Sequence, residues 1–432
     1  MAELLAEGHR AGVASKPRFE GTLRTDMATD RPLWQNRDYV LLWTGQAISI
    51  VGSNASLIAF PLLVLGLTDS PLATALVAAA RSVPYLLFTL PAGALVDRWN
   101  LKATMVVCSV ISALAMASVL LPIPAGALTV WHLATVSFLE GSCGVFFRLA
   151  ETSALTRIVP NRHFPRAIAQ QQLQYSLGAI LGPPLGAIFF STARLLPFIV
   201  DAGSYAISCL TTGAIRANLA ANRNANRRSL GNEIKEGLLW LWHHRLIRFM
   251  AGLSAGQNSL KASTVLLIVL LAARHESSPA LAGIALAACG VGGVVGALVA
   301  PWIQRRFSFG QAIVAICWAH CLIWMLFPIA VTPLHLIAIA AVSSFVGPAY
   351  DTVQMSYRLA LIPRALQGRV NSAYRLAADG SKAIGAALTG FSLEWIGLDR
   401  TLWLTAGLFV LLAIATTSNR AVREAPRLDE LQ

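Results

Sequence analysis

Long apolar runs separated by short polar stretches are the main pattern along this chain. An α-helix needs about 20 mostly apolar residues to cross a bilayer. Runs of this kind occur at 39–66, 72–96, 103–121, 129–150, 167–190, 197–215, 247–272, 280–303, 310–330, 334–356, 371–396 and 401–418. Strands of a membrane barrel would show short alternating segments instead. The pattern predicts an all-α integral membrane protein of about twelve helices in two groups of six.

Composition agrees with a chain embedded in lipid. Apolar residues make up 56% of the 432 positions and charged residues only 13%, with a mean hydropathy of +0.61. A soluble domain carries about 25% charged residues, so a water-soluble fold is excluded. The six cysteines all fall inside predicted spans, where no disulfide is expected. Cys317, His320 and Cys321 share one helical turn, but small core residues explain them better than a metal site. No metal or cofactor is expected.

The net charge of +13 reflects membrane topology. Basic residues collect in alternate loops and in the C-terminal tail: Arg98, Lys102, Arg157, Arg162, Arg166, Arg216, Arg223, Arg227, Arg228, Arg305, Arg306, Arg358, Arg364, Arg369, Arg420, Arg423 and Arg427. Because basic loops stay in the cytoplasm, both termini and the central loop are predicted to be cytoplasmic, in a bacterial-type inner membrane. Attraction to anionic lipid is expected and nucleic-acid binding is not. The first 34 residues lack the apolar core of a cleavable signal peptide.

An internal repeat relates the two groups of spans. The tetrapeptide Gly93–Val96 recurs unchanged as Gly296–Val299. The same offset pairs Trp99 with Trp302, Pro160 with Pro363, Arg166 with Arg369, and Gly182 with Gly385. Two such copies enclose a cavity at the membrane midplane that can open to either side. The predicted organisation is a tail at 1–38, a bundle at 39–215, a linker at 216–246, a bundle at 247–418 and a tail at 419–432.

The loop after the second span carries a recognisable signature. Gly93 is followed after three residues by Asp97-Arg98, then by Asn100 and Lys102. This order resembles the signature of the major facilitator superfamily, and the resemblance implies that Gly93, Asp97, Arg98 and Lys102 form a cytoplasmic gate. Gly93 is expected to let two helices approach closely. Asn100 replaces the family's second glycine and tolerates a left-handed turn. The alternative is a plain charged loop.

The fifth span contains a glycine-proline motif made of Gly178, Gly182, Pro183, Pro184 and Gly186. It looks like the family's antiporter motif, which is associated with exporters more than with uptake symporters. Proline bends a helix because it removes a backbone donor, and glycines on one face allow close packing. The alternative is a kinked, tightly packed helix that has no bearing on transport direction.

A narrower resemblance runs along residues 35–418. The stretch from Asn36 to Gln46 opens the first span as in an exporter branch that includes the enterobactin exporter and macrolide-efflux permeases. Val83-Pro84-Tyr85 agrees with the same branch. One position departs from a related pattern, because Ser137 stands where many proton-coupled drug antiporters have an arginine.

Ionisable residues inside a span are candidates for function, since burying a charge in lipid costs free energy. Glu140 and Arg81 fall near mid-membrane, and Lys261 lies further toward the outside. Asp379 and Lys382 are three residues apart on one helix face and are expected to neutralise each other. In the family, the first, fourth, seventh and tenth helices line the cavity. The resemblance therefore makes Glu140, Lys261 and Asn54 cavity candidates.

Two interpretations stay open for the central carboxylate. Glu140 is either a proton-coupling group or a structural partner of Arg81 or Lys261. Arg81 itself either takes part in function or extends its guanidinium group toward carbonyls at a helix end. Asp351 and Arg148 lie near cytoplasmic ends of their helices, where they either form a closing salt bridge or are solvated.

The predicted function is secondary export of a small hydrophobic or amphipathic molecule, such as a drug, secondary metabolite or siderophore, by proton antiport. The alternatives are an uptake symporter and a lysophospholipid or lipid permease of the same fold. An enzyme is not expected, because HExxH and GxSxG motifs are absent, and a nucleotide-driven pump would need a phosphate-binding loop. The expected partners are a small-molecule substrate, protons and membrane lipids, and the protein is expected to be a monomer.

Overall fold

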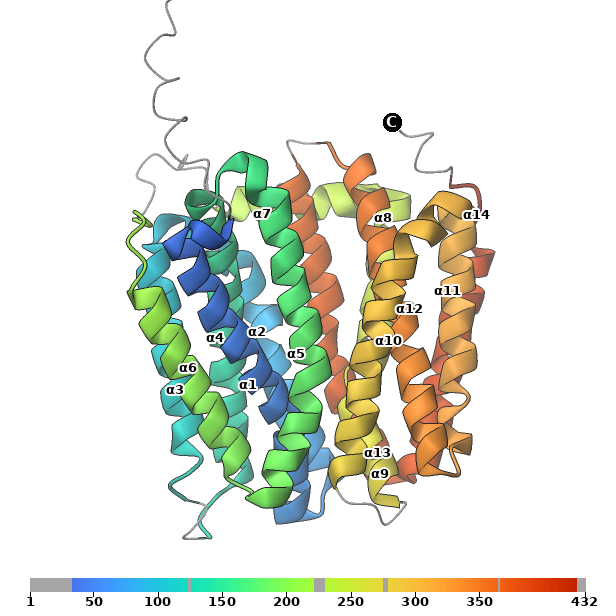
Figure 1. The fold of residues 1–432 in the computed structure, drawn as a ribbon. Coiled ribbons are helices and arrows are strands. Elements are labelled where there is room, and N and C mark those ends of the chain that lie inside the picture. Colours follow the sequence, from blue (N-terminus) through green and yellow to red (C-terminus); the bar gives the residue numbers. More distant parts are fainter. Residues whose placement is uncertain (1–32, 123–125, 221–229, 275–278, 364–365, 426–432) are drawn as a thin grey trace, which may run out of the picture.

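The computed structural model describes residues 33–122, 126–220, 230–274, 279–363 and 366–425, and all regular structure in them is helical. Long helices stand side by side in one bundle (Figure 1). In chain order they are η2 (Leu33–Gln35), α1 (Arg37–Thr68), α2 (Pro71–Arg98), α3 (Leu101–Ser118), α4 (Val130–Ile158), η3 (Asn161–His163), α5 (Phe164–Thr192), α6 (Leu196–Gly213), α7 (Leu230–His243), α8 (Arg245–Lys261), α9 (Thr264–Arg274), α10 (Pro279–Arg306), α11 (Phe309–Trp324), η4 (Phe327–Ile329), α12 (Pro333–Leu361), α13 (Gln367–Ser418) and α14 (Arg420–Arg423).

The all-α membrane fold predicted from the apolar runs is confirmed. Ten described stretches are long and apolar enough to cross a membrane. One of them, Arg369–Ser418, holds two predicted spans, because α13 changes direction at Gly397, where φ is +78°. A further predicted span corresponds to the 18 residues of α6, which are less apolar because Asp201 and several serines are buried among them. The ten stretches, the division of α13 and the addition of α6 together give the twelve predicted helices.

Two predicted boundaries differ from the structure. The fourth span was expected to end at residue 150, but α4 continues to Ile158, because Ala154, Leu155 and Ile158 are buried in an apolar cluster with the start of α1. The predicted span 247–272 is divided into α8 and α9. The break occurs where the Ala262 amide bonds to the Ser259 carbonyl, three residues back, instead of continuing the α-helical pattern.

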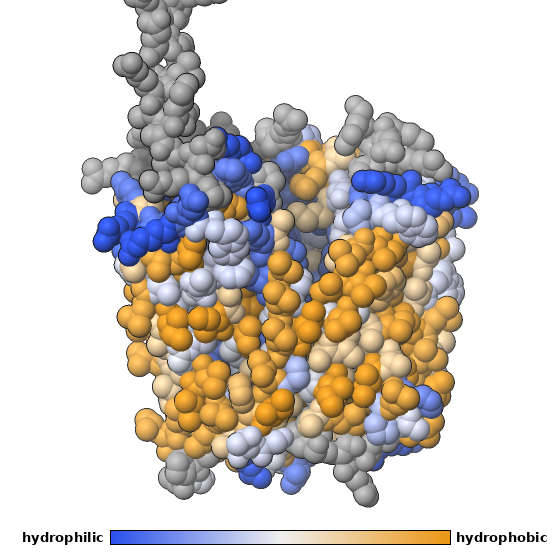
Figure 2. Space-filling model, in the orientation of Figure 1, coloured by the Kyte–Doolittle hydropathy of each residue, from blue (hydrophilic) through white to orange (hydrophobic). Residues whose placement is uncertain are grey.

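The described chain begins and ends at the same end of the bundle, which we call the terminal face (Figure 1). At the opposite face, the two groups of six helices pack on each other through a shared apolar cluster that includes Ile58, Ala187 and Leu267. Close backbone approach supports this contact, since a Cβ on Gly290 of α10 would lie 2.6 Å from Ile180 of α5. Figure 2 shows a broad apolar band across the visible side of the molecule and a hollow between the two groups at the terminal face. The bundle is thus closed at one face and open at the terminal face.

Short elements lie on the terminal face. α7, within the predicted linker, crosses this face (Figure 1) and packs against α13. A Cβ on Gly237 of α7 would lie 2.6 Å from the Arg369 carbonyl, and Glu236 forms a 2.5 Å ion pair with the Arg369 side chain. At the other end of the sequence, Leu33 of η2 is buried against the first group of helices. These contacts anchor the segments next to the bundles.

Candidate functional site

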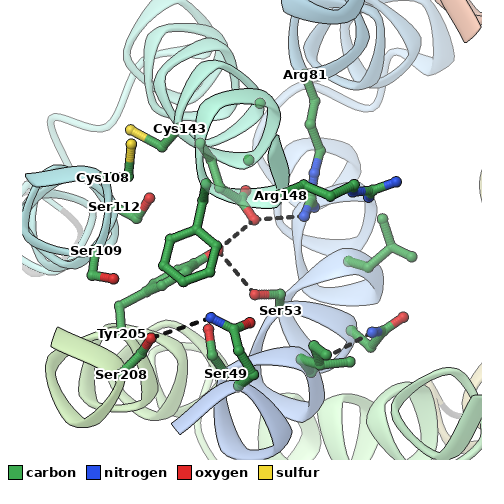
Figure 3. Close-up of a pocket in the computed structure, with 18 of the residues that line it drawn as sticks. Ser49, Ser53, Arg81, Cys108, Ser109, Ser112, Cys143, Arg148, Tyr205 and Ser208 are labelled. Carbon is green, nitrogen blue, oxygen red and sulfur yellow. Dashed lines mark hydrogen bonds and ion pairs between the residues drawn. The ribbon is translucent and has the colours of Figure 1, made fainter. Parts of the chain in front are cut away.

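A polar cavity of about 330 Å³ lies within the first group of helices. Its described walls come from α1 to α6, and the close-up in Figure 3 shows many of its side chains. The lining combines hydroxyl, thiol and aromatic groups with a few charges: Gln46, Ser49, Ser53, Asn54, Arg81, Tyr85, Cys108, Ser109, Ser112, Glu140, Cys143, Phe147, Arg148, Tyr175, Tyr205 and Ser208. Polar and charged groups gathered inside a membrane bundle make this cavity the candidate binding site.

An ion pair between Arg81 and Glu140 forms one wall of the cavity (Figure 3). The Arg81 guanidinium donates to Glu140 Oε1 at 2.5 Å. Glu140 is only 3% exposed, whereas Arg81 is 26% exposed toward the cavity. Gly141 permits this geometry, because a Cβ at that position would overlap the Arg81 carbonyl. Of the two partners considered for Glu140, the structure places Arg81 in contact with it.

A second buried carboxylate, Asp201 of α6, lies behind the cavity wall and was missed from the sequence. It is fully buried and accepts hydrogen bonds from Ser56 at 2.5 Å, Ser204 at 3.3 Å and Ser53 at 3.4 Å. Tyr205 links it to the ion pair, since the Tyr205 hydroxyl lies 2.9 Å from Ser53 Oγ and donates to Glu140 Oε1 at 3.1 Å. An aspartate near the start of the apolar run 197–215 is the signal that could have revealed it.

Arg148 is the second cation that lines the cavity. Its guanidinium lies 5.9 Å from the Tyr85 ring centroid and 5.7 Å from that of Tyr175. These distances are within the range of cation–π attraction. Arg148 also interacts electrostatically with Asp379 of the second group of helices. The side chain of Asp351, considered as its closing partner, is exposed.

The remaining charged candidates lie in the second group of helices. Lys261 Nζ lies 6.0 Å from the Tyr350 ring centroid. Lys382 donates to Asp379 at 2.8 Å, so these two residues do pair, and Arg375 lies 3.6 Å from the same carboxylate. None of Lys261, Asp379 and Lys382 is among the described residues that line the cavity. The structure therefore brings Arg81, Glu140 and Asn54 together at one cavity, whereas the other three candidates do not line it.

The glycines of the α5 motif pack against α1. A Cβ on Gly178 would overlap Ile50, one on Gly182 would overlap Asn54, and one on Gly186 would overlap the Ala55 carbonyl. Asn54 itself donates to the Ile50 carbonyl at 2.8 Å and faces the cavity. The motif thus fixes the distance between α1, which carries Ser53 and Asn54, and α5.

We expect Gly186→Ala to destabilise the protein by about 1–3 kcal/mol, because the added methyl group must push α1 and α5 apart. The matched control is Gly203→Ala on α6, where a Cβ meets no described atom within 4 Å. Heating of both purified variants in detergent, followed by size-exclusion chromatography, measures the difference. Equal unfolding temperatures for the two variants would contradict the packing role of Gly186.

The gate motif differs from expectation at two positions. A Cβ on Gly93 would meet no described atom within 4 Å, so no close helix approach occurs there in this conformation, and its role on closure stays a prediction. Its repeat partner Gly296 makes such an approach instead, against the Phe345 carbonyl. The tolerance of Asn100 for a left-handed turn is not used: its φ is −73°, and its side chain caps α3 by accepting from the Ala103 amide.

The other gate residues are placed only in part. The side chain of Asp97 lies outside the described residues. Arg98 is exposed at the end of α2. Lys102 donates to the Ile215 carbonyl at 2.8 Å and so ties the start of α3 to the end of α6.

No group of three or more metal-ligating side chains occurs among the described residues. Cys317 of α11 accepts a hydrogen bond from Gln257 at 3.4 Å, and His320 stacks on Phe409 with ring centroids 5.8 Å apart. Both residues are buried core side chains, as the sequence indicated.

Comparisons with known proteins agree with this architecture. Multidrug efflux pump Tap of Mycolicibacterium fortuitum is 27% identical over 391 residues, which cover 86% of this chain and 93% of that protein. Macrolide efflux protein A of Streptococcus pyogenes is 26% identical over 185 residues, 42% of this chain and 45% of that protein. The crystal structure of nucleoside transporter NupG covers 89% of this chain and 98% of its own, with a TM-score of 0.75 at 14% identity, and shows the shared fold.

The family description Major Facilitator Superfamily matches residues 42–377, most of the chain. This range includes the gate motif after α2 and the glycine-proline motif of α5, on which the resemblance was based. The chain belongs to the Major Facilitator Superfamily of membrane transporters.

Proposed function

We propose that this transporter exports small hydrophobic or amphipathic molecules from the cytoplasm in exchange for protons. The observation that carries the proposal is the Arg81–Glu140 pair, which is held in the wall of a polar cavity rather than between helices that face lipid. An ionised pair in that position costs free energy and is retained where ions or substrates bind. The names of the two relatives, a multidrug efflux pump and a macrolide efflux protein, support the direction of transport.

The cavity lining favours an amphipathic substrate. Aromatic rings from Tyr85, Phe147 and Tyr175 offer flat apolar contacts, and serine hydroxyls offer hydrogen bonds without a fixed charge pattern. Such mixed surfaces accept molecules of different shape, because few contacts demand one geometry. A drug, a secondary metabolite or a siderophore fits this description.

We propose that the terminal face is cytoplasmic and that the described conformation is open to the cytoplasm. The topology predicted from the sequence places the basic loops and both tails in the cytoplasm. The described chain begins and ends at the terminal face. The two bundles, proposed at 39–215 and 247–418, would then rock against each other, so that the terminal face closes and the opposite face opens. Closure of the terminal face would bring the gate residues Gly93, Asp97, Arg98 and Lys102 into use.

Accumulation of amphipathic compounds in cells tests the proposal. We expect cells that produce the protein to accumulate less ethidium, rhodamine 6G or erythromycin than cells without it. A proton uncoupler is expected to restore accumulation, because it removes the driving force. Asp97→Asn is expected to restore it as well, at unchanged protein level in the membrane, because the gate can no longer close.

The alternatives give different results in the same experiment. Higher accumulation would show uptake and would overturn the exporter assignment. Unchanged accumulation of all three compounds would contradict export of a broad range of drugs and would favour a narrow substrate, such as a siderophore or a lipid. Export that resists the uncoupler would contradict proton antiport but leave the direction intact.

A further inference from the structure

Asp201 and Glu140 lie at the two ends of one hydrogen-bonded chain. Asp201 Oδ1 is 3.4 Å from Ser53 Oγ, which is 2.9 Å from the Tyr205 hydroxyl, and that hydroxyl is 3.1 Å from Glu140 Oε1. Each intermediate group is a hydroxyl, which can donate one proton and accept another at the same time. Ser53, Tyr205 and Glu140 line the cavity, whereas Asp201 does not.

Charge counting shows what this cluster requires. It contains one cation, Arg81, and two carboxylates, Glu140 at 3% exposure and Asp201 at 0%. Asp201 is packed too closely for hydration, since a Cβ on Gly52 of α1 would lie 3.0 Å from Asp201 Oδ1 and 2.5 Å from Ser204 Oγ. A net negative charge in such surroundings is very costly. The cluster is electrically neutral only when it holds one proton.

The other titratable groups that face the cluster do not change this count. Tyr85 of α2 faces Arg81, Cys143 of α4 faces Glu140, and Tyr205 of α6 faces both carboxylates. Each of these side chains is uncharged when it carries its own proton.

We propose that Asp201 and Glu140 share a single exchangeable proton, with Asp201 as its storage position away from the substrate. This inference rests on the proposed proton antiport and assigns the second proton-binding residue to it. With the proton on Asp201, Asp201 donates to Ser53, Ser53 donates to Tyr205, and Tyr205 donates to Glu140. With the proton on Glu140, every donor in the chain reverses. Ser53 has one hydroxyl proton and two oxygen neighbours, Asp201 Oδ1 and the Tyr205 hydroxyl, so it donates to one of them at a time. This fits a chain of hydrogen bonds whose donors can point either way.

The transfer conserves every atom. The Asp201 carboxyl proton passes to Ser53 Oγ, the Ser53 proton passes to the Tyr205 oxygen, and the phenolic proton passes to Glu140 Oε1. Asp201 becomes a carboxylate, Glu140 becomes a carboxylic acid, and both hydroxyl groups are regenerated. A substrate that contacts Arg81 in the cavity can thus change the proton position without touching Asp201.

Infrared spectroscopy of the purified protein at neutral pH tests the proposal without any substrate. Protonated carboxyl groups give a carbonyl band separate from that of carboxylates, and spectra of wild type and variants are compared. Asp201→Asn leaves Arg81 opposite Glu140, and Glu140→Gln leaves Arg81 opposite Asp201, so neither variant needs the proton. We expect each single variant to lose the same amount of carboxylic acid signal, and the double variant to lose no more. The exposed Glu394→Gln serves as control and should lose none.

Two results would overturn the shared proton. If Asp201→Asn loses the signal while Glu140→Gln keeps it, Asp201 carries its own permanent proton. If neither variant loses it, the cluster holds no proton and the buried Glu151 accounts for the band. Glu140→Gln keeps Asp201 and its serine donors, so the test stands even if Asp201→Asn does not fold. Because no transport is measured, failure of the export assay leaves this result unaffected.

Discussion

Replacement of Arg81 with leucine is expected to destabilise the folded protein by about 3–5 kcal/mol. The substitution removes the partner that lies 2.5 Å from Glu140 and leaves a carboxylate that is 3% exposed. Breaking one side of a buried pair is costly, because the remaining charge is neither solvated nor neutralised. Thermal unfolding of the purified variant in detergent, followed by tryptophan fluorescence, measures the effect.

The double variant Arg81→Leu/Glu140→Leu separates charge from packing. We expect it to recover most of the lost stability, since replacing both members of a buried pair with apolar residues is often neutral. Combined with the two single variants, it completes a double-mutant cycle for the pair. A double variant as unstable as Arg81→Leu would show that packing around Arg81, rather than its charge, explains the loss.

Glu140→Gln is expected to remove the dependence of transport on the proton gradient. For each proton exchanged, the substrate concentration ratio that wild type can maintain changes about tenfold per unit of pH difference. A pH difference of one unit and a tenfold concentration ratio both correspond to about 1.4 kcal/mol. Glutamine keeps the shape and one accepting oxygen but carries no titratable proton. The variant should therefore equilibrate substrate across the membrane and give a flat pH profile. Transport into membrane vesicles at several imposed pH differences measures this.

Glu394→Gln is the matched control for that experiment, because Glu394 is exposed and lies outside the cavity lining. It should keep the wild-type pH profile. A Glu140→Gln variant that still concentrates its substrate in proportion to the pH difference would show that Glu140 is not the proton-coupling residue. Its pairing with Arg81 would then be structural, which was the alternative left open by the sequence.

Much of the fold follows from hydrophobic periodicity, since a bilayer demands continuous apolar helices. The two wrongly predicted boundaries have the same cause, which is that tertiary contacts determine where these helices end. α4 extends to Ile158 because Ala154, Leu155 and Ile158, which lie in a mostly polar stretch of sequence, are buried against α1. The break between α8 and α9 is not marked by a proline. Gly397 was a better signal, because its φ of +78° favours glycine and it lies between two predicted spans.

The candidate site was predicted less completely. Arg81 and Glu140 were identified, because charges at similar depth in the second and fourth spans stand out from apolar surroundings. Asp201 was overlooked, because its partners Ser53, Ser56 and Ser204 come from two helices and are inconspicuous in the sequence. Which charges share a cavity depends on how helices rotate about their axes, and a single sequence does not give that rotation.

Ser137 departs from the arginine that the resemblance predicts in the fourth span. Many related antiporters have an arginine there, one turn before the position of Glu140, whereas this chain has a buried serine. In this structure the guanidinium beside Glu140 belongs to Arg81 of α2. A cation beside the central carboxylate is therefore present, although it comes from a different helix.

Proton movement coupled to substrate movement is the most direct test of the proposed antiport. Proteoliposomes would contain a trapped pH indicator, and ethidium, whose charge is fixed, would be added outside while its entry is followed by fluorescence. Antiport predicts that ethidium enters the wild-type vesicles and that the lumen becomes alkaline as protons leave, while Glu140→Gln vesicles admit ethidium without a pH change. Ethidium entry into wild-type vesicles at constant pH, or with acidification, would contradict proton antiport.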